Sequence, residues 1–252
     1  MTRFAVAALA TLSIVLATGA HAQITSCSTD VSGGTVYRNL FVPDGATCSL
    51  DGVTVVGNVL VGTNSTLNVG SGTKIGGNIL ADSCNTVEVG AVGVPTPVFT
   101  PIFVGGNLEV DNCTLGGSFQ TPSMSGPGIT IRGNLSCENN GATCVMRGGE
   151  VGGNVRFINN GEASQIFNAT VGGNLSVSDN PSTSPGSEAA VVLGDTVGGN
   201  VEVNNNSGSG VIVSDNVIGG NLRCVNNSHG VSDDNSGPST VNGQKLGQCS
   251  GL

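Results

Sequence analysis

The stretch from residue 151 to residue 177, VGGNVRFINNGEASQIFNATVGGNLSV, decides the fold because it contains one seven-residue phrase twice, 20 residues apart. In this phrase an aliphatic residue precedes Gly-Gly-Asn, and two apolar positions then flank a variable one. Self-similarity at a short period is typical of repeat architectures. The whole chain has nine copies, and their repeat asparagines are Asn39, Asn58, Asn78, Asn107, Asn134, Asn154, Asn174, Asn200 and Asn221.

Successive repeat asparagines lie 19 to 29 residues apart, so a basic unit of about 20 residues is lengthened three times. Proline cannot join a ladder inside a sheet, so the proline-containing insertions are expected to be loops that protrude from a regular stack. The prolines of the three longer units are Pro95, Pro97 and Pro101; Pro122 and Pro127; and Pro181 and Pro185.

The alternation after each repeat asparagine predicts a strand whose first and third residues point inward and whose second points outward. The preceding Gly-Gly-Asn is expected to form a corner, because glycine and asparagine tolerate positive φ. A second polar position lies five residues after the repeat asparagine, and its amides are expected to hydrogen-bond to the coils above and below and to pair buried backbone at the turns. It is occupied by Asn112, Asn139, Asn159, Asp179, Asn205 and Asn226.

A 20-residue unit of short strands cannot enclose a core alone, but stacking makes its aliphatic columns continuous. The sequence therefore predicts an all-β protein with a single-domain parallel β-helix (β-solenoid) of about ten coils, with roughly 20 residues per coil. A β-propeller is the alternative, although its blades need about 40 residues each.

Coil length and asparagine-rich corners resemble the right-handed parallel β-helix proteins of the pectate-lyase-like superfamily. The phrases at 55–61 and 75–81 (Val-x-Gly-Asn-Val/Ile-x-Ala/Val) are also similar to those of bactofilins, which are small-repeat β-helices that polymerise. The resemblance covers most of residues 35 to 225 and implies a fold rather than an activity. Eight cysteines and an export signal depart from the bactofilin pattern, which is cytoplasmic.

Residues 1–22 have the features of a signal peptide: Arg3, an apolar run and a small-x-small site at Ala20-His21-Ala22. A single membrane span is the alternative, but the apolar run is short for one. We expect residues 23–252 to form the β-helix domain, with an N-terminal cap at about 23–34 and a C-terminal tail at about 226–252. The protein is then secreted: extracellular, at the cell surface or periplasmic. A lipobox ending at Cys27 is the competing interpretation of the N-terminus.

All eight cysteines lie after residue 22, which suits four disulfides in an oxidising compartment. Cys84 and Cys113 each lie six residues after a repeat asparagine, so they are expected to stack and to pair. Cys27 and Cys48 are about one coil apart. The remaining expected pairs are Cys137 with Cys144, within one coil, and Cys224 with Cys249, at the tail.

Charge limits the partners of this chain. Lys and Arg total 8 and Asp and Glu 17, a formal net charge of -9, which disfavours binding to nucleic acid or to an anionic membrane. The only histidine after residue 22 is His229, which we interpret as a solvated loop residue. Asp233 and Asp234 are interpreted as an acidic loop, so we expect neither a metal site nor a cofactor.

A polysaccharide lyase would need stacked carboxylates beside a basic residue on the outer face. Only Arg156 and Arg223 share the outward strand position, and neither has a run of acids expected beside it; Glu202 and Arg223 are expected to form an exposed ion pair. We therefore predict a secreted or cell-surface structural or interaction protein without catalytic activity. The alternative is a carbohydrate-active β-helix, which an outward groove with three converging acids and a basic residue would favour. Recognition of ice or another surface is a third possibility.

Three large apolar residues, Phe41, Leu60 and Leu80, occupy the outward position in the first three copies. Residues 23–33 or 95–103 could cover them. Alternatively they form an interface with a second copy or with a cell-surface or polysaccharide partner, because contiguous exposed apolar surface usually marks an interaction site.

Overall fold

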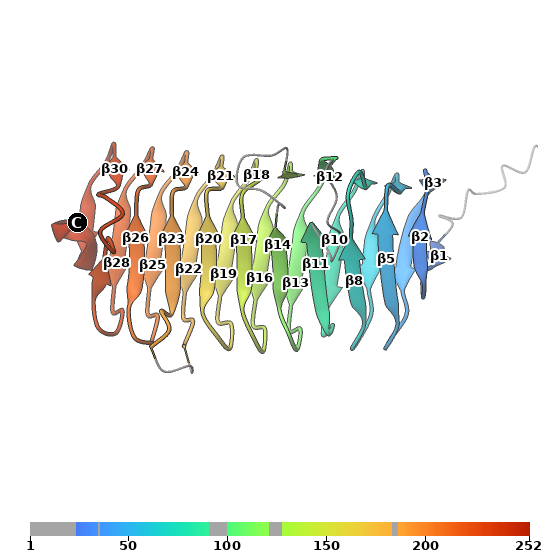
Figure 1. Ribbon diagram of the computed structural model, residues 1–252, viewed down its shortest axis with the longest axis horizontal. Helices are drawn as coiled ribbons and strands as arrows, with labels where there is room; N and C mark the ends of the chain where they lie inside the picture. Colours follow the sequence, from blue (N-terminus) through green and yellow to red (C-terminus); the bar gives the residue numbers. More distant parts are fainter. Residues whose placement is uncertain (1–23, 35, 91–99, 121–127, 183–185) are drawn as a thin grey trace, which may run out of the picture.

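The computed structural model describes residues 24–34, 36–90, 100–120, 128–182 and 186–252. These residues form a rod of stacked coils, and the chain advances along the long axis from β1 at one end to β30 at the other (Figure 1). Each coil gives one strand to each of three parallel sheets, here called A, B and C. The expected all-β parallel solenoid is therefore confirmed, with ten strands in each of two sheets and eleven in the third.

The strands are short and regular in all three sheets. Sheet A consists of β1 (Ile24–Ser26), β4 (Asn39–Val42), β7 (Val59–Val61), β10 (Ile79–Asp82), β13 (Leu108–Asp111), β16 (Leu135–Glu138), β19 (Val155–Ile158), β22 (Leu175–Ser178), β25 (Val201–Asn204), β28 (Leu222–Val225) and β31 (Lys245–Gly247). Sheet B consists of β2 (Asp30–Ser32), β5 (Thr47–Asp51), β8 (Thr66–Val69), β11 (Thr86–Gly90), β14 (Gly117–Gln120), β17 (Cys144–Arg147), β20 (Ser164–Phe167), β23 (Ala190–Leu193), β26 (Val211–Ser214) and β29 (Val231–Ser232). Sheet C consists of β3 (Val36–Tyr37), β6 (Thr54–Val55), β9 (Lys74–Ile75), β12 (Ile102–Val104), β15 (Ile129–Ile131), β18 (Glu150–Val151), β21 (Thr170–Val171), β24 (Thr196–Val197), β27 (Val217–Ile218) and β30 (Thr240–Val241). A 3-10 helix, η1 (Gln248–Gly251), follows β31.

The core is a set of aliphatic columns that run the length of the rod. Val155 in β19 lies between Leu135 in β16 and Leu175 in β22, and all three are fully buried. Burial of one such side chain stabilises the fold by roughly 1.5–3 kcal/mol. Because the described strands of each coil pair with those of the adjacent coils, this stabilisation accumulates coil by coil.

The repeat asparagines form a continuous ladder at the corner before sheet A. The Oδ1 of Asn134 accepts the backbone N–H of Asn154 at 2.8 Å, and the Oδ1 of Asn154 accepts that of Asn174 at 2.9 Å. The same bond links every consecutive pair from Asn39 to Asn221, and the last one goes to Gln244. The ladder fixes the height of each coil relative to the next at this corner.

The expectation of positive φ at this corner is wrong, because none of the Gly-Gly-Asn residues adopts it. Glycine is required there for space. A Cβ built on Gly153 would lie 2.5 Å from the Oδ1 of Asn134 and 2.8 Å from the carbonyl oxygen of Gly133. From Asn58 onward, the glycine before each repeat asparagine therefore leaves room for the amide of the coil below.

Positive φ belongs to the second polar position instead, at the corner between sheets A and B. Its six residues have φ between 53 and 59° and are exposed to solvent. Their side chains hydrogen-bond between coils, either to one another or, for Asn112 and Asn139, to Asp82 and Asp111. The expected hydrogen bonds between coils are therefore confirmed at this position, but the buried backbone is paired by the next residue along the chain. The left-handed residue turns the following side chain inward. We call these following residues the inner ladder: Asn140, Asn160, Asn180, Asn206 and Asn227.

Asn160 shows how the inner ladder works. Its Nδ2 donates to the carbonyl oxygen of Cys137 at 3.0 Å and to the Oδ1 of Asn180 at 3.1 Å. Its own Oδ1 accepts the N–H of Asn140 at 3.3 Å. Each inner amide thus pairs backbone groups that the turn would leave buried and unpaired, each of which would otherwise cost about 1–3 kcal/mol.

The four disulfides have the pairing that the spacings predict. Cys84 and Cys113, with Cα atoms 4.4 Å apart, occupy the same column as the inner ladder, and the N–H of Cys113 donates to the Oδ1 of Asn140 at 2.8 Å. The inner ladder therefore ends on a covalent rung, and at its other end Gln248 pairs with Asn227. The other pairs are Cys27–Cys48, Cys137–Cys144 and Cys224–Cys249.

Both ends of the rod continue the sheets. In the region expected as a cap, β1 pairs with β4 and β2 pairs with β5. The region expected as a tail contains β29, β30, β31 and η1. The expected signal peptide and much of the three proline-rich insertions, namely residues 91–99, 121–127 and 183–185, lie outside the described residues. Within the described part of the chain, no helix is long and apolar enough to cross a membrane.

Candidate functional site on the outer face of sheet A

Two columns of side chains face outward from sheet A. The first takes the second residue after each repeat asparagine, and register pairing aligns Phe41, Leu60, Leu80, Glu109 and Ser136 in it. The alternation continues to the fourth residue of the strand, which forms a second column. There Asp82, Asp111 and Glu138 lie in register. Two outward columns thus bring acidic residues together on β10, β13 and β16.

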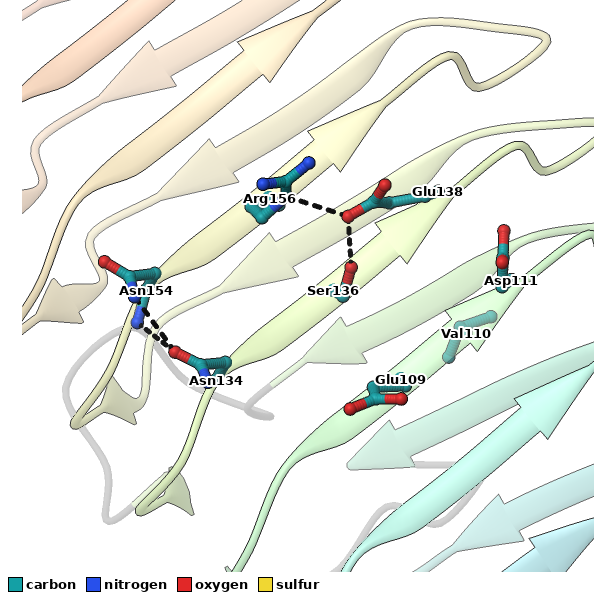
Figure 2. A pocket seen from close by; sticks show the side chains of 8 residues that line it. All are labelled: Glu109, Val110, Asp111, Asn134, Ser136, Glu138, Asn154 and Arg156. Carbon is teal, nitrogen blue, oxygen red and sulfur yellow. Dashed lines mark hydrogen bonds and ion pairs between the residues drawn. The ribbon is translucent and has the colours of Figure 1, made fainter.

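A shallow depression of about 370 Å³ lies on this face over β13, β16 and β19 (Figure 2). Its charged lining comes from Glu109, Asp111, Glu138 and Arg156. The remaining lining residues are Val110, Asn134, Ser136 and Asn154.

The depression is organised around Glu138. Its Oε1 lies 2.9 Å from the Nε of Arg156 and accepts a hydrogen bond from the Oγ of Ser136 at 2.6 Å. Figure 2 shows the carboxylate of Glu138 joined to both of these side chains. The side chain of Arg156 is 55% exposed, so water screens this ion pair and its contribution to stability is small.

The other two carboxylates bind amides rather than cations. Glu109 accepts a hydrogen bond from the Nδ2 of Asn107 at 3.2 Å, and Asp111 accepts one from the Nδ2 of Asn139 at 2.9 Å. In Figure 2 both lie apart from the Arg156–Glu138 pair. The acids therefore share a surface but do not converge on a single point.

We expected no run of acids beside Arg156, but Glu138 pairs with it, and Asp111 and Asp82 continue the column of Glu138. The expectation took account only of the outward second residue after each repeat asparagine. Glu138 and Asp111 occupy the fourth residue of their strands, which also faces outward. Glu202 and Arg223 are neighbours in register as expected. However, among the described side chains the ion pair observed is the one between Arg156 and Glu138.

The geometry limits what the depression can do. A lyase base must take up a proton, but Arg156 is a permanent cation that Glu138 holds in place. Among the described residues, no group of three or more His, Cys, Asp or Glu side chains is placed to hold a metal ion. His229 lies elsewhere, exposed, with its Nδ1 2.7 Å from the carbonyl oxygen of Gly208.

The apolar residues Phe41, Leu60 and Leu80 are consecutive register partners and are half-buried. Residues 24–32 do not cover them, because β1 extends sheet A and places Ser26 beside Phe41. Phe103 lies on sheet C, with the guanidinium of Arg132 5.0 Å from its ring centre. Residues 95–99 of the proposed covering segment lie outside the described residues.

One buried acid was missed by the sequence analysis. Asp195, at the corner between sheets B and C, is 1% exposed, and its Oδ1 accepts the N–H of Ala169 at 2.8 Å. Its Oδ2 has no partner. Burial raises the pKa of Asp195 to about 8, against the lowering effect of backbone hydrogen bonds from Ala169 and Leu193.

Together, the three parallel sheets, the amide ladders and the four disulfides define the class of the protein, a disulfide-bonded parallel β-solenoid. Comparison of the chain with protein-family models, curated proteins and solved structures gives no match. The resemblance to known β-helix proteins therefore stands at the level of the fold.

Proposed function

We propose that this chain is a secreted or cell-surface structural and interaction protein without catalytic activity. The observation that carries the proposal is the state of the charged groups in the depression. Arg156 is tied to Glu138, while Glu109 accepts from the amide of Asn107 in its own coil and Asp111 from that of Asn139 in the next coil. This arrangement suits a rigid, charged surface better than a site for proton transfer.

The cysteines support the extracellular part of the proposal. All eight form disulfides, which persist in oxidising compartments. Disulfides at both ends of the rod, Cys27–Cys48 and Cys224–Cys249, hold the terminal coils, where fraying would begin. An exposed scaffold benefits from such reinforcement.

A carbohydrate-active β-helix is the second candidate, and the acids beside Arg156 favour it. The test is a screen of the purified, oxidised protein for turnover of pectin, alginate and related uronans, with and without calcium. We expect no turnover. Turnover that is lost in Glu138→Gln, but kept in the exposed control Glu202→Gln, would overturn the proposed function.

A further inference from the structure

The apolar column and the acidic residues form one continuous surface. We define the sheet A strip as Phe41, Leu60, Leu80, Asp82, Glu109 and Asp111. Leu80 pairs in register with both Leu60 and Glu109, so the apolar part passes directly into the acidic part. At about 4.8 Å per strand, Phe41 and Glu109 are roughly 14 Å apart along the rod.

The three carboxylates of the strip carry uncompensated charge. Asp82 accepts from the Nδ2 of Asn112 at 3.0 Å, and Glu109 and Asp111 also bind amides. In the described part of the chain, the cation paired on this face is Arg156, and its partner is Glu138, outside the strip. The strip therefore offers apolar contact at one end and negative charge at the other.

We propose that the sheet A strip docks an extended segment of a partner protein in which aliphatic residues are followed by lysine or arginine. This inference rests on the proposed function, because it specifies the kind of partner that an interaction protein of this type would bind. The complementarity of charge selects the occupant. A second copy of this chain would bring a net charge of -9 against an acidic face, and an acidic polysaccharide would also be repelled.

The periodicity of an extended chain fits the strip. Successive residues of a strand advance about 3.3 Å, so every second side chain, about 6.6 Å apart, faces the same surface. Four such side chains cover the length from Phe41 past Glu109. Two aliphatic residues would contact Phe41, Leu60 and Leu80, and two cations would then meet the carboxylates.

The test uses a fluorescein-labelled peptide, GLSLSKSKG, and fluorescence anisotropy with the full-length, oxidised protein. We expect saturable binding that weakens with added salt. Replacing both lysines of the peptide by glutamate, or both leucines by serine, should reduce affinity at least tenfold. A Leu60→Ser/Leu80→Ser variant and a Glu109→Gln/Asp111→Asn variant should each produce a similar loss.

Matched variants separate the strip from general attraction to an acidic protein. Glu202→Gln/Asp215→Asn removes the same charge from exposed positions elsewhere, and Ile212→Ser changes an outward residue of sheet B; both should bind like the wild type. If Leu60→Ser/Leu80→Ser does not fold, the charge variant decides alone, because its residues lie outside the core.

Three results would overturn the inference. They are the absence of binding, equal loss in the charge-matched control, and concentration-dependent self-association in sedimentation velocity that Leu60→Ser/Leu80→Ser abolishes. The last result would make a second copy the occupant. If the peptide does not bind and no uronan is turned over, this inference is wrong but the proposed function is not contradicted. If a uronan is turned over, the proposed function is wrong.

Discussion

Asp195 occupies a position where asparagine would be fully paired. In the next coil, Asn216 accepts the N–H of Asp195 through Oδ1 and donates through Nδ2 to the carbonyl oxygen of Val192 at 2.9 Å. The corresponding carbonyl one coil below belongs to Ile166, which pairs in register with Val192. The carboxyl of Asp195 is instead buried away from water with its Oδ2 unpartnered, and this loss of solvation disfavours the ionised form and raises the pKa.

Asp195→Asn should therefore stabilise the protein and reduce its pH dependence. The pKa of Asp195 is about 8 in the folded state and about 3.9 in the unfolded state. The raised pKa therefore contributes stability that is fully present below about pH 4, and this contribution is lost as the pH rises toward 8. The loss is roughly 1.4 kcal/mol per pH unit in that window. Urea unfolding of both proteins at pH 5, 7 and 9 measures it.

Asp215→Asn is the matched control, because Asp215 is exposed at the same corner of the next coil, directly before Asn216. It should leave the pH dependence of unfolding as in the wild type. If Asp195→Asn lowers stability at pH 9, or if its pH profile matches that of the wild type, the assignment of the alkaline loss to Asp195 is incorrect.

At the scale of elements, a column rather than a single strand is the unit of this fold. The column at the corner between sheets A and B begins with Cys84 and Cys113 and continues as the inner ladder from Asn140. A covalent rung and an amide rung thus solve the same problem in different coils. Both hold adjacent turns together, and the amide rung also pairs backbone carbonyls of the turn.

This equivalence predicts that asparagine can replace the disulfide. Cys84→Asn/Cys113→Asn should extend the inner ladder, so it should melt at a higher temperature than Cys84→Ala/Cys113→Ala, which leaves the turn without side-chain partners. Two recovered rungs at about 1 kcal/mol each correspond to a few degrees in Tm. Differential scanning calorimetry provides the comparison, and equal Tm values would show that the two rungs are not interchangeable.

At the scale of the whole molecule, each strand in the described part of the chain pairs with strands of the coils above and below it. Stability in such a rod is close to a sum over units and their interfaces. Deleting residues 155–174, one complete 20-residue unit, joins Asn154 directly to Leu175 and preserves every column. The shortened protein should fold cooperatively, with a rod shorter by about 4.8 Å.

Deleting only residues 155–164 is the control. It joins Asn154 to Gln165 and moves the following residues out of register, so inward aliphatic positions would meet outward ones. Far-UV circular dichroism and small-angle X-ray scattering distinguish the two deletions. If both variants fold, or both fail, the stack does not behave as a set of separable units.

The sequence alone determined the period, the inward columns and the class of fold, because these depend on the order of residues within one coil. It also placed Cys84 and Cys113 at the same offset, and equal offsets become neighbours in any stacked solenoid. The tertiary structure decided which residue of each Asn-Asn pair, such as Asn159 and Asn160, has a buried side chain. It also decided that a side chain at Gly153 would collide with Asn134, and that Asp111 and Glu138 lie near Arg156. These features depend on corner dihedrals and on contacts between residues about 20 positions apart, which exist only after the coils have stacked.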